Sequence, residues 1–257
     1  MKAKPGSSLV CSWGGVGTTA VLEFLESLPG YSVNPSSGYL NPLKHPLRPP
    51  DGAERAVFLF GCPELSLLSL FRRGYDRLHY VNVNDLFPKE MPYPHGNLWA
   101  LTCRKFGLRE LEPGVWANEE GQFADRCGAL DWLEERKSER ARAEAEVDRL
   151  ALAAYRTFED LLDKGVDVFR RLEQLRNWAG GASYPVLLVR YESLWQRLHE
   201  VLEFLQVPRN EWDRFPSFKP RSSNLDQLSS AQLRKLRLFC RDLNETVSNL
   251  PDLHRPG

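Results

Sequence analysis

Apolar residues near the N-terminus first form a continuous run and then recur at helical spacing. The run from Ser8 to Trp13 is rich in apolar, β-forming residues, which is typical of a buried strand. Beyond a glycine cluster, Val21, Phe24 and Leu25 recur at the spacing of one helix face. The stretch 8–26 therefore predicts a strand, a tight loop and a helix.

Two later apolar runs, Arg55 to Phe60 and Tyr184 to Arg190, predict parallel strands buried on both faces. Short strands are expected at 31–34 and 79–83. Helical spacing covers 64–73, 97–106, most of 122–179, 192–205 and 229–250. Strands separated by helices predict a mostly parallel sheet in a three-layer α/β/α fold. We expect one domain over 1–257, with a mostly helical insertion at about 120–180.

Composition limits the classes of function. Lys plus Arg number 34 and Asp plus Glu number 34, so no overall field recruits nucleic acid or an anionic membrane. The 5 cysteines lack CxxC spacing, which argues against a disulfide framework or a zinc site and indicates a reducing compartment. Without an apolar stretch long enough to span a bilayer, or a signal-peptide pattern, we expect a cytoplasmic protein. The sequence leaves the oligomeric state open.

The loop between the first strand and the first helix has the residue types of an anion-binding site. It consists of Gly14, Gly15, Val16, Gly17, Thr18 and Thr19. Glycine permits positive φ and close approach of a ligand, and a new helix exposes unpaired N–H groups. Phosphate is the usual anion in such a place. The simpler alternative is an ordinary glycine-rich turn between a strand and a helix.

Two classes of phosphate loop fit this stretch poorly. A nucleoside-triphosphatase loop needs a lysine before its Ser or Thr, to reach the terminal phosphates, and residues 14–19 contain none. A dinucleotide fold needs GxGxxG or GxGxxA, and Gly15 to Ala20 fits the second form. That fingerprint also needs an acidic residue to hold the ribose, and the expected second strand at 31–34 offers none.

Four pieces of the chain together carry a family resemblance. They are the loop Gly14–Thr19, the pair Lys44-His45, the run Val57 to Pro63 followed by Ser69, and the stretch from Val186 to Pro208. In this order they resemble the sulfotransferase family, whose members transfer a sulfuryl group from 3′-phosphoadenosine 5′-phosphosulfate to an alcohol, phenol or amine. The resemblance covers about residues 6–75 and 184–225. It implies the P-loop NTPase-like sulfotransferase fold and a reaction that requires no metal.

The resemblance also implies roles for individual residues. The loop 14–19 would hold the phosphosulfate of the donor, and His45 would be the general base on the hydroxyl of a small-molecule acceptor. Lys44 would offset charge on the leaving phosphate. Ser69 is expected at the 3′-phosphate, where Arg72 or Arg73, with Lys219 and Arg221, would supply the positive charge. His79, His95, His199 and His254 follow no ligand spacing, and we expect them on the surface or in packing.

Two cations of the family pattern are absent. Gly15 replaces the loop lysine, and Gly61 replaces the arginine that holds the 3′-phosphate. One lost donor of this kind costs about 10²–10³ in rate. The sequence therefore leaves two alternatives open: a catalytically altered nucleotide-binding relative, and a nucleotide-dependent kinase or dinucleotide enzyme that uses the same loop.

Overall fold

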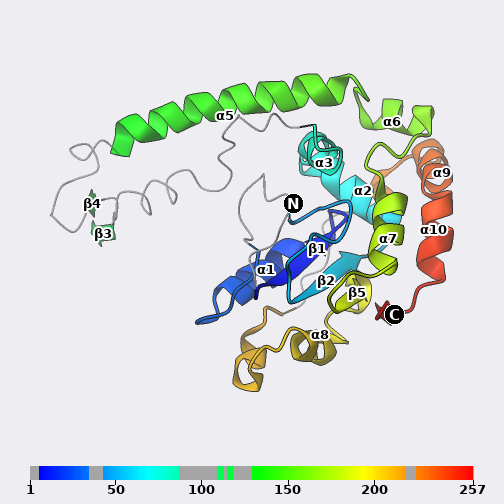
Figure 1. The fold of residues 1–257 in the computed structure, drawn as a ribbon. Coiled ribbons are helices and arrows are strands. Elements are labelled where there is room, and N and C mark those ends of the chain that lie inside the picture. The colour runs from blue at the N-terminus through cyan, green and yellow to red at the C-terminus, as the bar shows by residue number, and fades with distance from the viewer. Residues whose placement is uncertain are drawn as a thin grey trace. The chain divides into compact units, whose positions relative to one another are not determined.

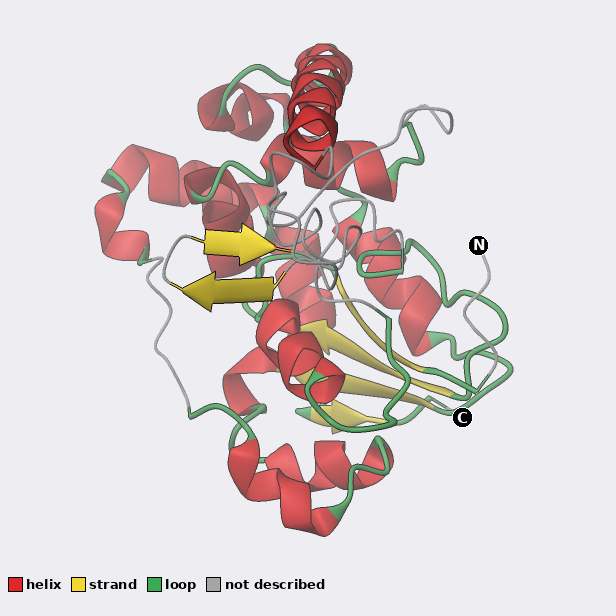
Figure 2. Cartoon of the chain, turned by 90° about the vertical axis from the view of Figure 1, so that its left-hand side faces the viewer, coloured by secondary structure: helices red, strands yellow, loops and turns green. Residues whose placement is uncertain are grey.

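Strands from four distant parts of the chain form the central sheet of the computed structural model, which describes residues 6–34, 43–86, 109–112, 115–117, 129–217 and 224–256. The strands are β1 (Ser8–Ser12), β2 (Arg55–Phe60), β5 (Val186–Arg190) and β6 (Leu253–His254). Their order is β1-β2-β5-β6. β1 and β2 are parallel, as are β2 and β5, whereas β6 runs antiparallel to β5 (Figures 1 and 2). The protein is therefore α/β with a mostly parallel sheet.

Helices make up most of the rest of the described chain. They are α1 (Thr18–Glu26), α2 (Pro63–Arg72), α3 (Asp76–Val83), α5 (Ala129–Leu152), α6 (Phe158–Lys164), α7 (Arg171–Ala179), α8 (Leu198–Phe204), α9 (Ser230–Phe239) and α10 (Arg241–Ser248), with 3-10 turns η1 (Tyr191–Ser193), η2 (Arg209–Arg214) and η3 (Leu225–Gln227). A separate antiparallel pair joins β3 (Arg109–Glu112) to β4 (Val115–Ala117). None of the described helices combines the length and the hydropathy that crossing a membrane requires.

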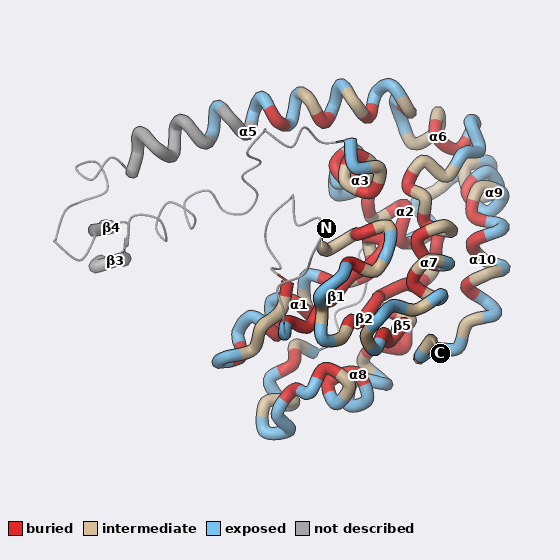
Figure 3. The backbone as a smooth tube through the Cα atoms, in the orientation of Figure 1, coloured by how far each residue is buried: buried red, intermediate tan, exposed pale blue. Residues whose placement is uncertain are grey.

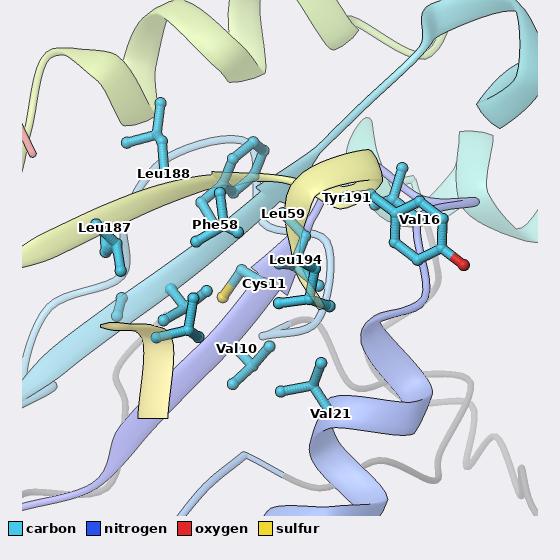
Figure 4. Packing of buried hydrophobic residues seen from close by; sticks show 14 of the residues in the cluster. Val10, Cys11, Val16, Val21, Phe58, Leu59, Leu187, Leu188, Tyr191 and Leu194 are labelled. Carbon is cyan, nitrogen blue, oxygen red and sulfur yellow. The ribbon is translucent and has the colours of Figure 1, made fainter. Parts of the chain in front are cut away.

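Side chains on both faces of the sheet form the main hydrophobic core. Val10 of β1 points toward Val21 of α1 (Figure 4), and the strand register places Val57 level with Val10 and Leu187. Phe58 points to the opposite face, where its ring stacks on Trp178 of α7 with 4.8 Å between centroids. β1 and most of β2 and β5 are buried (Figure 3). Helices therefore cover both faces of the sheet, and the parallel strands end at one common edge.

The contacts within the chain divide it into two compact units. The first comprises Met1–Ser36, Asn41–Leu86 and Leu150–Gly257, and the second comprises Ser37–Leu40 and Phe87–Arg149. The four-stranded sheet belongs to the first unit, and the pair β3-β4 to the second. All the candidate site residues belong to the first unit.

Several predicted elements are confirmed. The apolar runs are β1, β2 and β5, and the helix expected at 64–73 is α2. Helices α5, α6 and α7 account for most of the described part of the region 122–179. The long helix expected at 229–250 begins with a capping box between Ser229 and Gln232, and it divides into α9 and α10 at Cys240.

Other expectations were wrong or were met in part. The strand expected at 79–83 is the helix α3, which Asp76 in its first turn favours. The strand at 31–34 is reduced to one parallel bridge between Ser8 and Val33. The helix at 192–205 is confined to α8, after the turn η1. The helix expected at 97–106 lies outside the described residues.

Candidate functional site

The loop after β1 turns the chain sharply into α1. Gly14, Gly15 and Gly17 have φ angles of 88°, 71° and 71°, in the left-handed region that favours glycine. Gly17 is also the N-cap of α1 and supplies no side-chain cap. Within this fully described helix, no first-turn residue is acidic. The first N–H groups and the dipole of α1 therefore favour an anion.

The loop packs tightly against its neighbours. A Cβ at Gly15 would lie 2.4 Å from the carbonyl oxygen of Ser66 in α2, and one at Gly17 would lie 2.4 Å from the ring of Tyr191. Val16, between them, is buried. With this backbone, the family's lysine has no room at the position of Gly15. Any cation for a bound anion must come from another segment.

Lys44 and Arg73 bring positive charge to the first turn of α1. The Nζ atom of Lys44 donates to the hydroxyl of Thr19 at 2.8 Å, and the backbone carbonyl of Lys44 accepts from the amide of Ser12 at 2.9 Å. Burial, followed by repulsion from Arg73, lowers the pKa of Lys44 to about 8. The positive charge of Arg73 therefore reaches Lys44 beside the loop.

The ring of His45 is held in one tautomer. Its Nδ1 atom lies 2.9 Å from the carbonyl oxygen of Ser12 and 3.2 Å from the Oγ atom of the same residue. A carbonyl oxygen only accepts, so Nδ1 carries the proton and Nε2 keeps the lone pair. Burial holds the pKa of His45 well below its usual value, and the positive charge of Lys44 lowers it further. At neutral pH, His45 is a neutral imidazole with a basic Nε2.

Ser12, the last residue of β1, joins the strand to the loop and the helix. Its Oγ accepts from the amide of Gly14 at 3.1 Å and from the hydroxyl of Thr18 at 2.6 Å. Both Ser12 and Thr18 are buried, whereas Thr19 is exposed. Of the two threonine hydroxyls in the predicted site, that of Thr18 supports the loop from inside, and that of Thr19 meets solvent and Lys44.

His79 of α3 lies buried beneath the loop. Its ring meets the ring of His45 edge to face, with 4.8 Å between centroids, and a Cβ at Gly14 would lie 2.9 Å from it. Within the described chain, neither ring nitrogen has a hydrogen-bond partner. Burial lowers the pKa of His79 to about 3, so the ring is neutral. His79 is a packing residue, as expected.

The adjacent part of the same edge, where β2 and β5 end, carries carboxylates. Glu192 of η1 accepts from the amide of Cys62 at 3.1 Å, and Cys62 is the N-cap of α2. Glu64, in the first turn of α2, is buried and accepts from Nδ2 of Asn244 at 2.6 Å. Negative charge therefore already matches the N-terminus of α2. A 3′-phosphate placed after Gly61, as the resemblance implies, would meet two carboxylates.

The structure brings most of the predicted site residues to one edge of the first unit. These are the loop Gly14–Thr19, Lys44, His45 and Arg73. Ser69 and Arg73 follow Ser66 at helical spacing, so they lie on the side of α2 that meets Gly15. The Nε atom of Arg73 donates to the carbonyl of Ser69 at 3.2 Å. The other two predicted residues, Lys219 and Arg221, lie outside the described residues.

Sequence reasoning missed three polar residues around this edge: Ser12, Glu192 and Gln174. Ser12 and Glu192 have ordinary positions at the ends of β1 and β5, and no sequence signal distinguishes them. Gln174 is completely buried in α7, on the same face as Leu175 and Trp178. A polar residue at an apolar position of the helix period was the available signal.

Comparison of the chain with models of protein families, with curated proteins and with solved structures finds no match. Among the described residues, no three or more His, Cys, Asp or Glu side chains form a group that could hold a metal ion. The chemistry of the site is therefore argued from its own geometry.

Proposed function

We propose that this chain is a sulfotransferase-like enzyme with a P-loop NTPase-like sulfotransferase fold. It would bind the phosphosulfate of 3′-phosphoadenosine 5′-phosphosulfate at the loop Gly14–Thr19 and move the sulfuryl group to a hydroxyl or amine of a small acceptor. The observation that carries this proposal is the convergence of a neutral imidazole, His45, and a lysine, Lys44, on an uncapped helix N-terminus.

His45 would take the acceptor proton onto Nε2, the nitrogen that its contact with the Ser12 carbonyl leaves basic. The acceptor oxygen or nitrogen would form a bond to sulfur, and the bond from sulfur to the bridging oxygen would break. The leaving electron pair then stays on the phosphate. Lys44 and the first N–H groups of α1 would offset that charge.

The residues present fit one end of the donor better than the other. For the 5′-phosphosulfate, the site has the α1 N-terminus, Lys44 and Arg73. For the 3′-phosphate, the position after β2 has Gly61 and the carboxylates Glu64 and Glu192. These carboxylates favour a second candidate function, in which the chain is a relative with altered specificity that binds a nucleotide without a 3′-phosphate.

Calorimetric titration without added metal tests both candidates. The ligands are adenosine 3′,5′-bisphosphate, ADP and NAD. Selective binding of the bisphosphate supports the sulfotransferase proposal, and sulfate transfer to an acceptor panel, lost in His45→Ala, would follow. Preference for ADP supports the second candidate, and preference for NAD supports a dinucleotide enzyme. Failure of all three ligands to bind contradicts both proposals.

Matched variants locate any binding that is seen. Arg73→Ala should weaken binding, whereas Arg72→Ala, which removes the adjacent arginine of the same helix, should leave it nearly unchanged. Thr18→Val removes the hydroxyl that supports the loop, and Thr18→Ser keeps it. If Arg72→Ala weakens binding as much as Arg73→Ala, the ligand lies elsewhere.

A further inference from the structure

Three side chains of α7 hold the segment that carries His45. Gln174 donates through Nε2 to the carbonyl of Pro46 at 2.9 Å, and the indole nitrogen of Trp178 donates to the same oxygen at 3.1 Å. Asn177 donates to the carbonyl of Leu47 at 3.1 Å. The backbone directly after His45 is thus fixed by a helix about 130 residues away in sequence.

Gln174 also reaches the group that orients the His45 ring. Its Nε2 lies 3.3 Å from the carbonyl oxygen of Ser12, the same oxygen that receives Nδ1 of His45 at 2.9 Å. The amide group of Gln174 therefore donates one proton to the Pro46 carbonyl and the other to the Ser12 carbonyl, which also accepts from His45. Within the described chain, the side chains of Asn177 and Trp178 bond to Leu47 and Pro46, and that of Gln174 bonds to Ser12 as well as Pro46.

The burial of Gln174 shows that this arrangement has a cost. The side chain is completely buried on the packed face of α7, where an aliphatic residue would serve for packing alone. A buried carboxamide lowers stability unless its hydrogen bonds are made. Its Nε2 makes two such bonds, although Oε1 has no partner among the described residues. Packing therefore does not explain glutamine at this position, but positioning of the two carbonyls does.

We propose that Gln174 is a positioning residue for His45. By holding the carbonyls of Ser12 and Pro46 it keeps Nδ1 of His45 protonated and bonded, and leaves Nε2 as the base. The role in catalysis rests on the proposed function, whereas the effect on the His45 ring does not. The two can therefore fail separately.

Long-range nitrogen–proton correlation spectra of protein with isotope-labelled histidine test the ring directly. A His45→Asn variant assigns the His45 signals among the 5 histidines. Wild-type protein should show the Nδ1–H tautomer at neutral pH. An Nε2–H tautomer in the wild type would overturn the proposal even if every variant at position 174 failed to fold.

Gln174→Met keeps the length of the side chain and removes its donors, and Asn177→Ala is the matched control on the same helix. In Gln174→Met the His45 tautomers should mix and the pKa of His45 should fall further, because the bond to the Ser12 carbonyl that raises this pKa is loosened. Asn177→Ala should leave both unchanged. A folded Gln174→Met protein with an unchanged His45 spectrum, or equal changes in the two variants, would overturn the proposal.

Activity gives a second readout if the sulfotransferase proposal holds. Gln174→Met should lower kcat about 10²-fold, the cost of a small misplacement of a reacting group, with little change in donor KM. The acid limb of its pH profile should move to lower pH, because His45 with a lower pKa stays unprotonated at lower pH. Absence of nucleotide binding with the expected spectra would reject the proposed function and leave the positioning of His45 intact.

Discussion

The common edge at which the parallel strands end carries opposite charge at its two ends, the β1 end and the β2–β5 end. At the end of β1 the chain leaves α1 uncapped and places Lys44 and Arg73 beside it. At the ends of β2 and β5 the first turn of α2 is matched by Glu192 and Glu64. Both helices start with N–H groups that have no partner within the helix, although Pro63 supplies none to α2. The side chains around the two helix starts therefore decide which one is open to an anion. The comparison shows that a strand–loop–helix pattern marks a possible phosphate site, and the charges around it select among such sites.

The largest effect should come from a side chain at Gly15, where the loop packs on α2. Gly15→Lys combines a positive φ with a Cβ only 2.4 Å from the Ser66 carbonyl, so unfolding in urea should show a loss of about 3 kcal/mol. Gly74→Ala has a similar φ of 66° with open space around it, and should cost only about 1 kcal/mol. Equal losses would mean that the contact with Ser66 does not constrain the loop.

Acid should destabilise the β1 end of this edge through its buried histidines. The pKa of His79 is about 3 in the folded protein and near 6.5 when unfolded, so the unfolded chain binds more protons between these values. Above pH 6.5 the titration of His79 does not lower the free energy of unfolding, and below it that free energy falls by about 1.4 kcal/mol per pH unit. The lowered pKa of His45 acts in the same direction. Urea unfolding at pH 7.5 and pH 5 should show a smaller loss in His79→Leu than in wild type. The exposed-site control His199→Leu should lose as much as wild type.

Removing the cation at the β1 end should weaken nucleotide binding. Lys44→Met should cost about 10- to 100-fold in affinity, the range for a hydrogen bond to a charged group. In wild type, affinity should also fall above pH 8, because the pKa of Lys44 is about 8, and this pH dependence should vanish in the variant. Calorimetry with the preferred nucleotide measures both. Lys235→Met, on α9, is the control, and an equal loss there would point to non-specific charge.

Removing the anion at the β2–β5 end should have the smallest effect. Glu192→Gln takes a partly solvated carboxylate away from the α2 N-terminus, so affinity for adenosine 3′,5′-bisphosphate should rise about two- to fivefold. Affinity for ADP should stay the same. Glu203→Gln on α8 controls for overall charge. A gain for both nucleotides would show that Glu192 repels the ligand generally and does not select against a 3′-phosphate.

Local patterns in the sequence predicted the parts of the fold that depend on local physics. Continuous apolar runs predicted β2 and β5, because strands that are buried on both faces are apolar along their whole length. Glycine spacing gave the loop 14–19, since its positive φ angles require glycine. The alternating valines of 79–83 suggested a strand, but burial of Leu78 and Val81 on one side of a helix prevailed.

The rest of the site depends on contacts between residues far apart in sequence. The carboxylate of Glu192 meets Cys62 only because β5 lies beside β2. Gln174 meets Ser12 across 162 positions of the chain. Neither pair has a spacing that could be recognised before the strand order is known. For the same reason, β6 was not predicted, because it is a two-residue strand that pairs with β5 at the end of the chain.

The hydrogen bonds from α7 to the segment that carries His45 have a consequence for synthesis on the ribosome. The loop 14–19, Lys44, His45 and Arg73 are all made within the first third of the chain, yet Gln174, Asn177 and Trp178 emerge much later. Contacts between such distant residues form slowly and late. A nascent chain that stops before α7 would contain the loop and its cations and still lack the ordered site. The ligand would therefore bind only to chains whose synthesis has passed α7, and only those chains would be stabilised by it.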